Sequence, residues 1–210
     1  SFFSKMWEVK HQSIGCPASS YVTINFDPTL INKTPIKLEW YDGGLRPSYP
    51  SLIPSDTYLG GKRNTNGVMM IGEDGIITTN VYGQNPRLFT KDKEVISPKI
   101  KNLPKDDWGH QRMWIDAIKD GYGSSKHKML TSSFDYAGPM TETVLMGNIA
   151  IRSYLLNTNG NPDSVRINGK NKNSYYGRRK MTWDGENMKI TNFEDANQFV
   201  GRSYREGWEL

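Results

Sequence analysis

The chain has 210 residues, one cysteine and a formal net charge of +5 at pH 7. One cysteine excludes an intrachain disulfide and a paired-cysteine metal or redox site, and no apolar run reaches the roughly 18 residues that would cross a bilayer. The N-terminus also lacks the basic-then-apolar layout of a signal peptide, although Ser1 could follow a removed segment, so we expect a soluble domain with no membrane partner and leave both the cytoplasm and the periplasm open as its compartment.

The first third of the chain predicts β-strands. Three stretches carry β-forming residues, and the second and third alternate apolar and polar side chains: Trp7–Lys10, Ser20–Phe26 and Ile36–Tyr41. Pro28 ends the second stretch, and Asp42-Gly43-Gly44 ends the third with residues that tolerate positive φ. Alternation with period two is typical of a sheet with one buried face.

A hairpin is predicted in the middle of the chain. Val68–Ile71 and Ile76–Val81 flank the short link Gly72-Glu73-Asp74-Gly75, and both runs are apolar enough to be buried. Arg87–Phe89 is compatible with a further strand, and Thr90–Lys105 predicts a connection over the surface. No glycine-rich motif of the dinucleotide-binding or P-loop type occurs, so we expect no cofactor to bind this chain.

Two helices are expected to form the core with the sheet. The first is Trp108–Asp120, capped by Asp106 or Asp107, and Gly121–Lys128 follows it as a flexible link. The second runs from Pro139 to Arg152, because Pro139 suits a first helical position and an apolar stripe follows it.

The positive charge is concentrated after this helix. Residues 152–180 hold seven Lys or Arg against one acid, Asp163, which gives +6, whereas the rest of the chain sums to −1. A local basic loop is usually a solvated insertion, so we expect a polar insertion at about 153–179. A nucleic-acid interface is the alternative that Tyr175 and Tyr176 keep open.

The C-terminus predicts a second hairpin and a short helix. Lys180–Trp183 and Met188–Ile190 flank a turn that contains Asp184-Gly185, and Asn192 is placed to cap the helix that follows.

Three stretches resemble the C-terminal domain of Gfo/Idh/MocA-type NAD(P)-dependent oxidoreductases: WYDGGLRP, FDYAGPMTETVLMGNIAIR and MTWDGENMKITNFEDANQFVGRSYREGWEL. The similarity spans most of residues 1–152 and 180–210. It implies an N-terminal Rossmann domain that binds NAD or NADP in the full-length protein, followed by an α/β domain on a large open sheet. Only that second domain is expected here, since the family's Glu-Lys-Pro motif is absent, and no catalytic residue is carried across.

Four residues are predicted to contact substrate. Tyr41, Asp42 and Arg46 follow a strand end and offer a stacking face, an acceptor and a cation, although turn formation alone explains these three residues equally well. His110 lies in the first turn of a helix and could exchange a proton with a sugar hydroxyl, its alternative being a surface histidine. We expect no metal site.

The sequence therefore predicts one α+β domain over residues 1–210, with a large, mostly antiparallel open sheet and helices on one face. The expected function is the substrate-side and oligomerisation half of a sugar-type oxidoreductase, not catalytic alone. Six tryptophans and eleven tyrosines leave a non-catalytic carbohydrate-binding module as the alternative. Two helices cover one sheet face, so we expect a homo-oligomer that buries the other, with a sugar-like small molecule as ligand.

Overall fold

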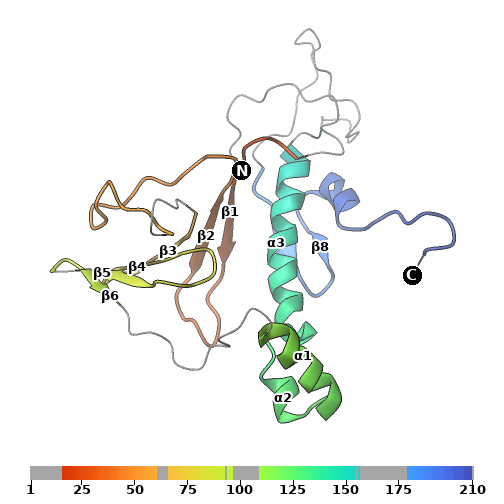
Figure 1. Cartoon of the computed structure of the whole chain (residues 1–210). Helices are drawn as coiled ribbons and strands as arrows, with labels where there is room; N and C mark the ends of the chain where they lie inside the picture. The colour runs from red at the N-terminus through yellow and green to blue at the C-terminus, as the bar shows by residue number, and fades with distance from the viewer. Residues whose placement is uncertain are drawn as a thin grey trace, which may run out of the picture. The chain divides into compact units, whose positions relative to one another are not determined.

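The computed structural model describes the following residues: 16–60, 66–92, 94–96, 109–154, 156 and 179–209 (Figure 1). The chain divides into two compact units: the first is Ser1–Arg46 with Thr131–Leu210, and the second is Pro47–Leu130. The predicted α+β class with open antiparallel sheets is confirmed. The single large sheet is not: the described strands form three small sheets, of two, four and two strands.

The first unit is built on the hairpin of β1 (Tyr21–Phe26) and β2 (Ile36–Tyr41). The strands are antiparallel, with Tyr21 opposite Tyr41 and Phe26 opposite Ile36. Both strands match the predicted ranges, because the alternation of apolar and polar side chains that marks a strand can be read from neighbouring residues in the sequence. The expectation that one face is fully buried is wrong for β2, whose apolar residues Ile36, Leu38 and Trp40 are all exposed.

The longest helix, α3 (Phe134–Tyr154), contacts β1 in this unit (Figure 1). A Cβ at Gly147 would lie 3.9 Å from Cγ1 of Val22, which is an ordinary van der Waals distance, so this contact does not require glycine. The predicted start at Pro139 is wrong. The carbonyl of Ser133 already accepts the N–H groups of Tyr136 (3.0 Å) and Ala137 (2.7 Å), which closes the first turn before Pro139 is reached.

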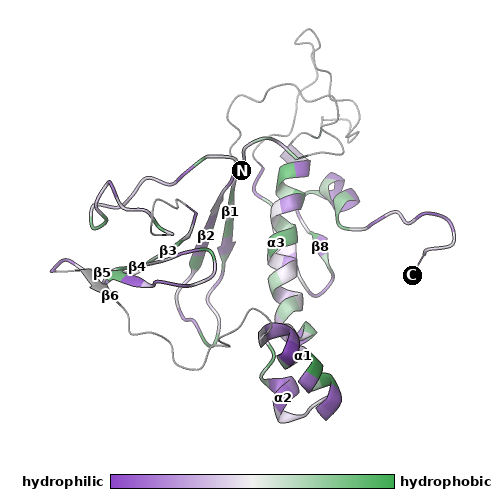
Figure 2. Ribbon diagram, in the orientation of Figure 1, coloured by the Kyte–Doolittle hydropathy of each residue, from purple (hydrophilic) through white to green (hydrophobic). Residues whose placement is uncertain are grey.

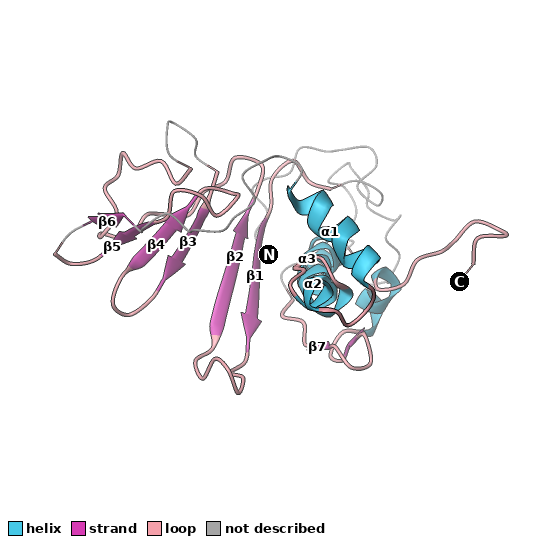
Figure 3. Ribbon diagram, turned by 60° about the horizontal axis from the view of Figure 1, so that its bottom comes forward, coloured by secondary structure: helices cyan, strands magenta, loops and turns pink. Residues whose placement is uncertain are grey.

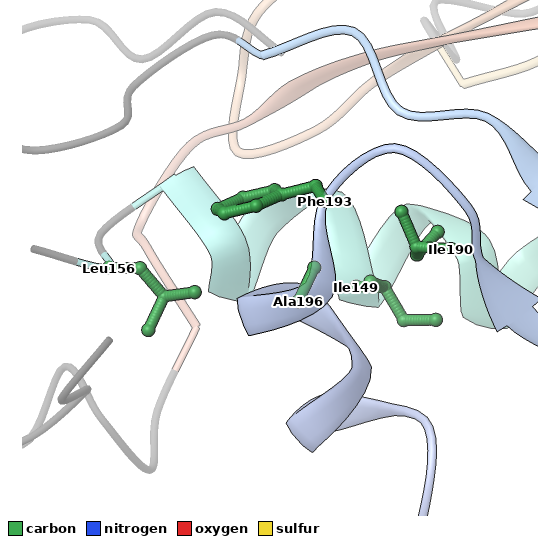
Figure 4. Close-up of a cluster of buried hydrophobic side chains, with 5 residues drawn as sticks. All are labelled: Ile149, Leu156, Ile190, Phe193 and Ala196. Carbon is green, nitrogen blue, oxygen red and sulfur yellow. The ribbon is translucent and has the colours of Figure 1, made fainter. Parts of the chain in front are cut away.

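The core of the first unit joins the end of α3 to the C-terminal segment. It contains β7 (Trp183–Asp184), β8 (Lys189–Ile190) and the 3₁₀ helix η2 (Glu194–Phe199). Five buried apolar residues make up the cluster: Ile149, Leu156, Ile190, Phe193 and Ala196 (Figure 4). Burying one large apolar side chain of this kind contributes about 1.5–3 kcal/mol, so this cluster ties the elements together.

Two asparagines fix the backbone around this cluster. The Asn197 amide accepts the N–H of Ile190 at 2.7 Å and donates to its carbonyl at 3.0 Å. Asn192 does not cap η2 as predicted. Its amide instead accepts from the Thr182 N–H (2.8 Å) and donates to the Lys180 carbonyl (3.1 Å), which closes the hairpin base.

The second unit contains a four-stranded meander in the order β3 (Val68–Ile71), β4 (Ile76–Thr79), β5 (Arg87–Phe89) and β6 (Glu94–Ile96). The predicted hairpin and the strand at Arg87 are confirmed. β6 lies inside the stretch predicted as a connection. Ile76 and Phe89 are buried with Ile53, whereas β3 was wrongly expected to be buried and is largely exposed.

Two helices complete the second unit: α1 (Gly109–Asp120) and α2 (Ser125–Lys128), which lie side by side (Figure 3). The range of α1 matches the prediction, but its role as a core helix does not. Its buried residues are Gly109 and Ala117, while Trp114 and Ile118 are exposed, and both apolar and polar residues colour its surface (Figure 2). The predicted flexible link contains α2, which Ser124 caps by accepting the His127 N–H at 3.1 Å.

Three predictions fall partly or wholly outside the described residues. They are the strand Trp7–Lys10, the cap at Asp106 or Asp107, and all but the edges of the insertion at 153–179, with the nucleic-acid alternative that rests on it. At its first edge, Ser153 and Tyr154 continue α3 and Leu156 is buried. Within the described part of the chain, every helix is too short or too polar to span a membrane.

Candidate functional site

The end of β2 forms a tightly built turn. The Asp42 N–H donates to the Ser20 carbonyl at 2.9 Å, and the Ser19 hydroxyl donates to the Gly43 carbonyl at 2.7 Å. Gly43 has φ +64°, and a Cβ there would lie 1.9 Å from the Ala18 carbonyl oxygen. Only glycine fits position 43. The turn that starts at Asp42 therefore holds Tyr41, the last residue of β2, in a fixed place.

Tyr41 stacks on a second tyrosine that the sequence did not single out. The ring centroids of Tyr21 and Tyr41 are 4.6 Å apart, with 29° between the ring planes. The two residues face each other because they are directly opposite in the β1–β2 register. Together they form one aromatic surface at the end of the hairpin.

A carboxylate and an ammonium group lie on the same face of the hairpin. The Tyr21 hydroxyl donates a short hydrogen bond to Oε1 of Glu39, and Nζ of Lys37 lies 2.6 Å from the same oxygen. Among the residues that the structure describes, nothing bonds to Oε2 of Glu39. The site therefore keeps one carboxylate oxygen available as an acceptor beside the aromatic surface.

The charges of this group follow from its contacts. The hydrogen bond from Lys37, and then the one from Tyr21, lowers the pKa of Glu39, and the same Lys37–Glu39 contact raises the pKa of Lys37. Burial, helped by Tyr21, raises the pKa of Tyr41 to about 12. At neutral pH Glu39 is an ionised carboxylate, Lys37 an ammonium group and Tyr41 a neutral phenol.

This combination suits a ring that carries hydroxyl groups. The C–H faces of a sugar or cyclic polyol pack on aromatic rings, while its hydroxyls donate to carboxylate oxygens and accept from ammonium groups. Charge-assisted hydrogen bonds are about twice as strong as neutral ones, so Oε2 of Glu39 is the strongest acceptor of the group.

The structure places the four predicted contact residues in different situations. Tyr41 lies in the tyrosine pair, whereas Asp42 accepts the Gly43 N–H at 2.7 Å and so serves the turn. Arg46 is exposed, with no hydrogen bond or ion pair to any described residue. His110 is exposed on α1, which belongs to the other unit.

Three further residues, Tyr21, Lys37 and Glu39, complete the group and were missed. All three stood in predicted strands, on the polar face of the alternation. The signal that identifies them is the pairing register, which brings Tyr21 next to Tyr41.

The remaining reactive side chains form no comparable group. Within the described residues, no three His, Cys, Asp or Glu side chains come together as metal ligands would. Asp135 and Tyr136 lie in the first turn of α3.

The tryptophans bear on the carbohydrate-binding alternative. Trp40 is 62% exposed and Trp114 is 55% exposed, while Trp183 is half-buried and donates to Glu142 at 2.5 Å. Two exposed indole rings are compatible with that alternative.

Comparison with models of protein families and with curated proteins finds no match for this chain.

Proposed function

We propose that the chain is the substrate-side and oligomerisation domain of a sugar-type NAD(P)-dependent oxidoreductase. In this proposal NAD or NADP is bound by a Rossmann domain of the full-length protein, and this chain binds the sugar-like substrate without catalysing hydride transfer alone.

One observation carries the substrate side of the proposal. The stacked pair Tyr21–Tyr41 stands beside Glu39, an ionised carboxylate with one oxygen unpaired, at the end of a strand. The stretch WYDGGLRP, which contributes to the family resemblance, begins in β2 and builds the turn that fixes Tyr41.

The arrangement around α3 is compatible with the same family. The stretch FDYAGPMTETVLMGNIAIR lies entirely within α3, and α3 contacts an antiparallel sheet. The stretch that contains MTWDGENMKI forms the hairpin of β7 and β8, which the core cluster joins to α3.

A non-catalytic carbohydrate-binding module is the second candidate. The exposed side chains of Trp40 and Trp114 favour it, since a binding module presents aromatic rings to solvent. The coding sequence upstream of Ser1 discriminates between the two: a strand, a glycine-rich turn and a helix in that order support the oxidoreductase.

Self-association belongs to the proposal as well. Ile36, Leu38 and Trp40 leave an apolar strip of β2 uncovered, and Val68, Met70 and Ile71 do so on β3. Uncovered apolar surface of this kind is typical of an interface between subunits.

Titration of the isotopically labelled chain with monosaccharides, cyclic polyols and sugar acids tests the substrate side. We expect saturable shifts of the Tyr21, Glu39 and Tyr41 amide resonances, which Tyr41→Ala abolishes and Tyr41→Phe largely keeps because the stacking face remains. Tyr82→Ala is the matched control, since Tyr82 is 83% exposed and lies in the other unit. Absence of shifts with every ligand would reject a sugar site here.

A further inference from the structure

β2 is an edge strand in the sheet that the described residues form with β1. It pairs with β1, and no other described strand pairs with it. Its first five side chains are exposed, and only Tyr41 is half-buried. An open edge presents unpaired N–H and C=O groups to any strand that can match them.

The hydrogen-bonding phase of the hairpin determines which groups point outward. The Asp42 N–H donates to the Ser20 carbonyl, so Asp42 directs its backbone groups toward the first strand. Because alternate residues of an antiparallel strand direct their groups to the same side, Trp40, Leu38 and Ile36 also point toward β1. The N–H and C=O groups of Lys37, Glu39 and Tyr41 therefore point outward from the hairpin.

The side chains then select one register for pairing of β2 with itself. In a two-fold antiparallel pair centred on Leu38, Lys37 lies opposite Glu39 of the second copy, twice. Their outward-pointing backbone groups are the ones that an antiparallel hydrogen-bonded pair requires. Ile36 lies opposite Trp40 of the second copy, so the apolar faces continue across the junction.

The neighbouring registers are disfavoured. Centring the pair on Lys37 places two ammonium groups opposite each other, and centring it on Glu39 does the same with two carboxylates. Shifting one β2 strand by a single residue relative to the other joins the apolar face of one copy to the polar face of the other. It also places residues whose backbone N–H and C=O groups point outward opposite residues whose groups point toward β1.

We propose that β2 pairs edge to edge with β2 of a second copy about Leu38, giving a four-stranded sheet in the order β1-β2-β2-β1. Pro35 lies opposite Tyr41 of the second copy in this register. Proline has no N–H, so the new ladder ends there.

The pairing also deals with the apolar strip of β2. Trp40, Ile36 and Leu38 are 62%, 51% and 38% exposed in the single chain. In the four-stranded sheet Ile36 lies opposite Trp40 of the second copy and Leu38 opposite Leu38, all on the same face, and cross-strand pairs of aromatic and branched side chains stabilise a sheet. This inference rests on the self-association proposed above and specifies the surface used. It shares Lys37 and Glu39 with the candidate site, but its test measures self-association and not ligand binding.

Charge reversal in the full chain tests the register. Lys37→Glu leaves two acidic side chains on each β2, and Glu39→Lys leaves two basic ones. Since position 37 faces position 39 of the second copy, a dimer of either variant places like charges opposite each other at two pairs. We expect a dissociation constant about tenfold higher for each in sedimentation velocity, since a cross-strand charge pair changes by several tenths to about 1 kcal/mol. An equimolar mixture restores opposite charges, so it should recover the wild-type constant as a mixed dimer, identified by labelling one variant isotopically. The double variant K37E/E39K should also dimerise like wild type.

The recovery in the mixture separates the inference from simple misfolding, because misfolded variants do not rescue one another. Thermal unfolding of each variant is the second control, since the exposed Lys37–Glu39 pair within one chain contributes little. A wild-type chain that sediments as a monomer overturns both the self-association and the edge pairing. A wild-type dimer that both reversals leave intact overturns only the edge pairing, and its loss on Trp40→Ser would then assign the apolar face as the interface.

Discussion

The indole N–H of Trp183 donates to Oε1 of Glu142 at 2.5 Å and so joins the C-terminal hairpin to the middle of α3. The contact is close on its other side too, since a Cβ at Gly185 would lie 2.8 Å from the same carboxylate oxygen. A charge-assisted bond in a partly buried place costs more to break than it contributes, because the orphaned group stays desolvated.

The first prediction concerns this bond. Glu142→Ala leaves the indole N–H of Trp183 unpaired and should lower the free energy of unfolding by about 1–3 kcal/mol in chemical denaturation. Glu142→Gln keeps an acceptor and should cost less than half as much. An equal loss of unfolding free energy in both variants would mean that the hydrogen bond between Glu142 and Trp183 does not stabilise the fold.

The second prediction compares two adjacent glycines with positive φ. Gly43→Ala places a Cβ against the Ala18 carbonyl, whereas nothing lies within 4 Å of a Cβ at Gly44. Gly44→Ala should therefore cost only about 1 kcal/mol for the left-handed conformation, and Gly43→Ala clearly more. Thermal unfolding measures both, and an identical shift in Tm would show that the turn relaxes around Gly43.

The third prediction is spectroscopic. Burial raises the pKa of Tyr41 from its ordinary 10.0 to about 12. The near-ultraviolet absorbance difference between wild type and Tyr41→Phe, followed against pH, should have its midpoint near 12. A midpoint near 10 would mean that the Tyr41 ring is not held against Tyr21 in solution.

The fourth prediction is the pH dependence of the hairpin. The pKa of Glu39 is lowered from 4.5, so its contribution is fully present above pH 4.5 and is lost as the pH falls through the lower folded value. The pKa of Lys37 is raised from 10.5, so its contribution is present below pH 10.5 and is lost as the pH rises through the higher folded value.

Between these limits the stability difference between wild type and Glu39→Gln should be constant. It should shrink below pH 4.5, because the protonated carboxyl no longer attracts Lys37. Melting curves of both proteins from acid to neutral pH measure the difference, and a gap that widens in acid would reverse the assigned sign.

Local patterns predicted the elements well. The alternation of β1 and β2, the glycine-bounded link between β3 and β4, and the spacing of α1 all placed backbone segments within a few residues. These signals depend on neighbours in sequence, which the chain itself supplies.

Burial could not be predicted in the same way. The sequence pattern of an apolar stretch does not depend on whether another element covers it. This holds for Trp114–Ile118 on α1 and for Val68–Ile71, which are exposed for the most part. The early start of α3 was missed for a related reason, since Pro139 suits a first turn by itself and only the Ser133 carbonyl bonds show the helix beginning earlier.

Only part of the candidate site was predicted from the sequence. Tyr41 and its turn follow from position at a strand end, which the residues Asp42-Gly43-Gly44 mark directly. Tyr21, Lys37 and Glu39 depend on which residues face one another across the hairpin, and a single sequence does not state that register.

The two residues that flank the segment 157–178, Leu156 and Arg179, both contact the buried cluster of the first unit. Leu156 is buried in the cluster that contains Phe193 (Figure 4), and the guanidinium of Arg179 lies 4.4 Å from the centre of the Phe193 ring. The entropy of closing a loop grows only with the logarithm of its length, so a foreign domain spliced between Leu156 and Arg179 would add little to the cost of folding. This makes the junction a natural place to graft a fluorescent reporter whose own termini are close together.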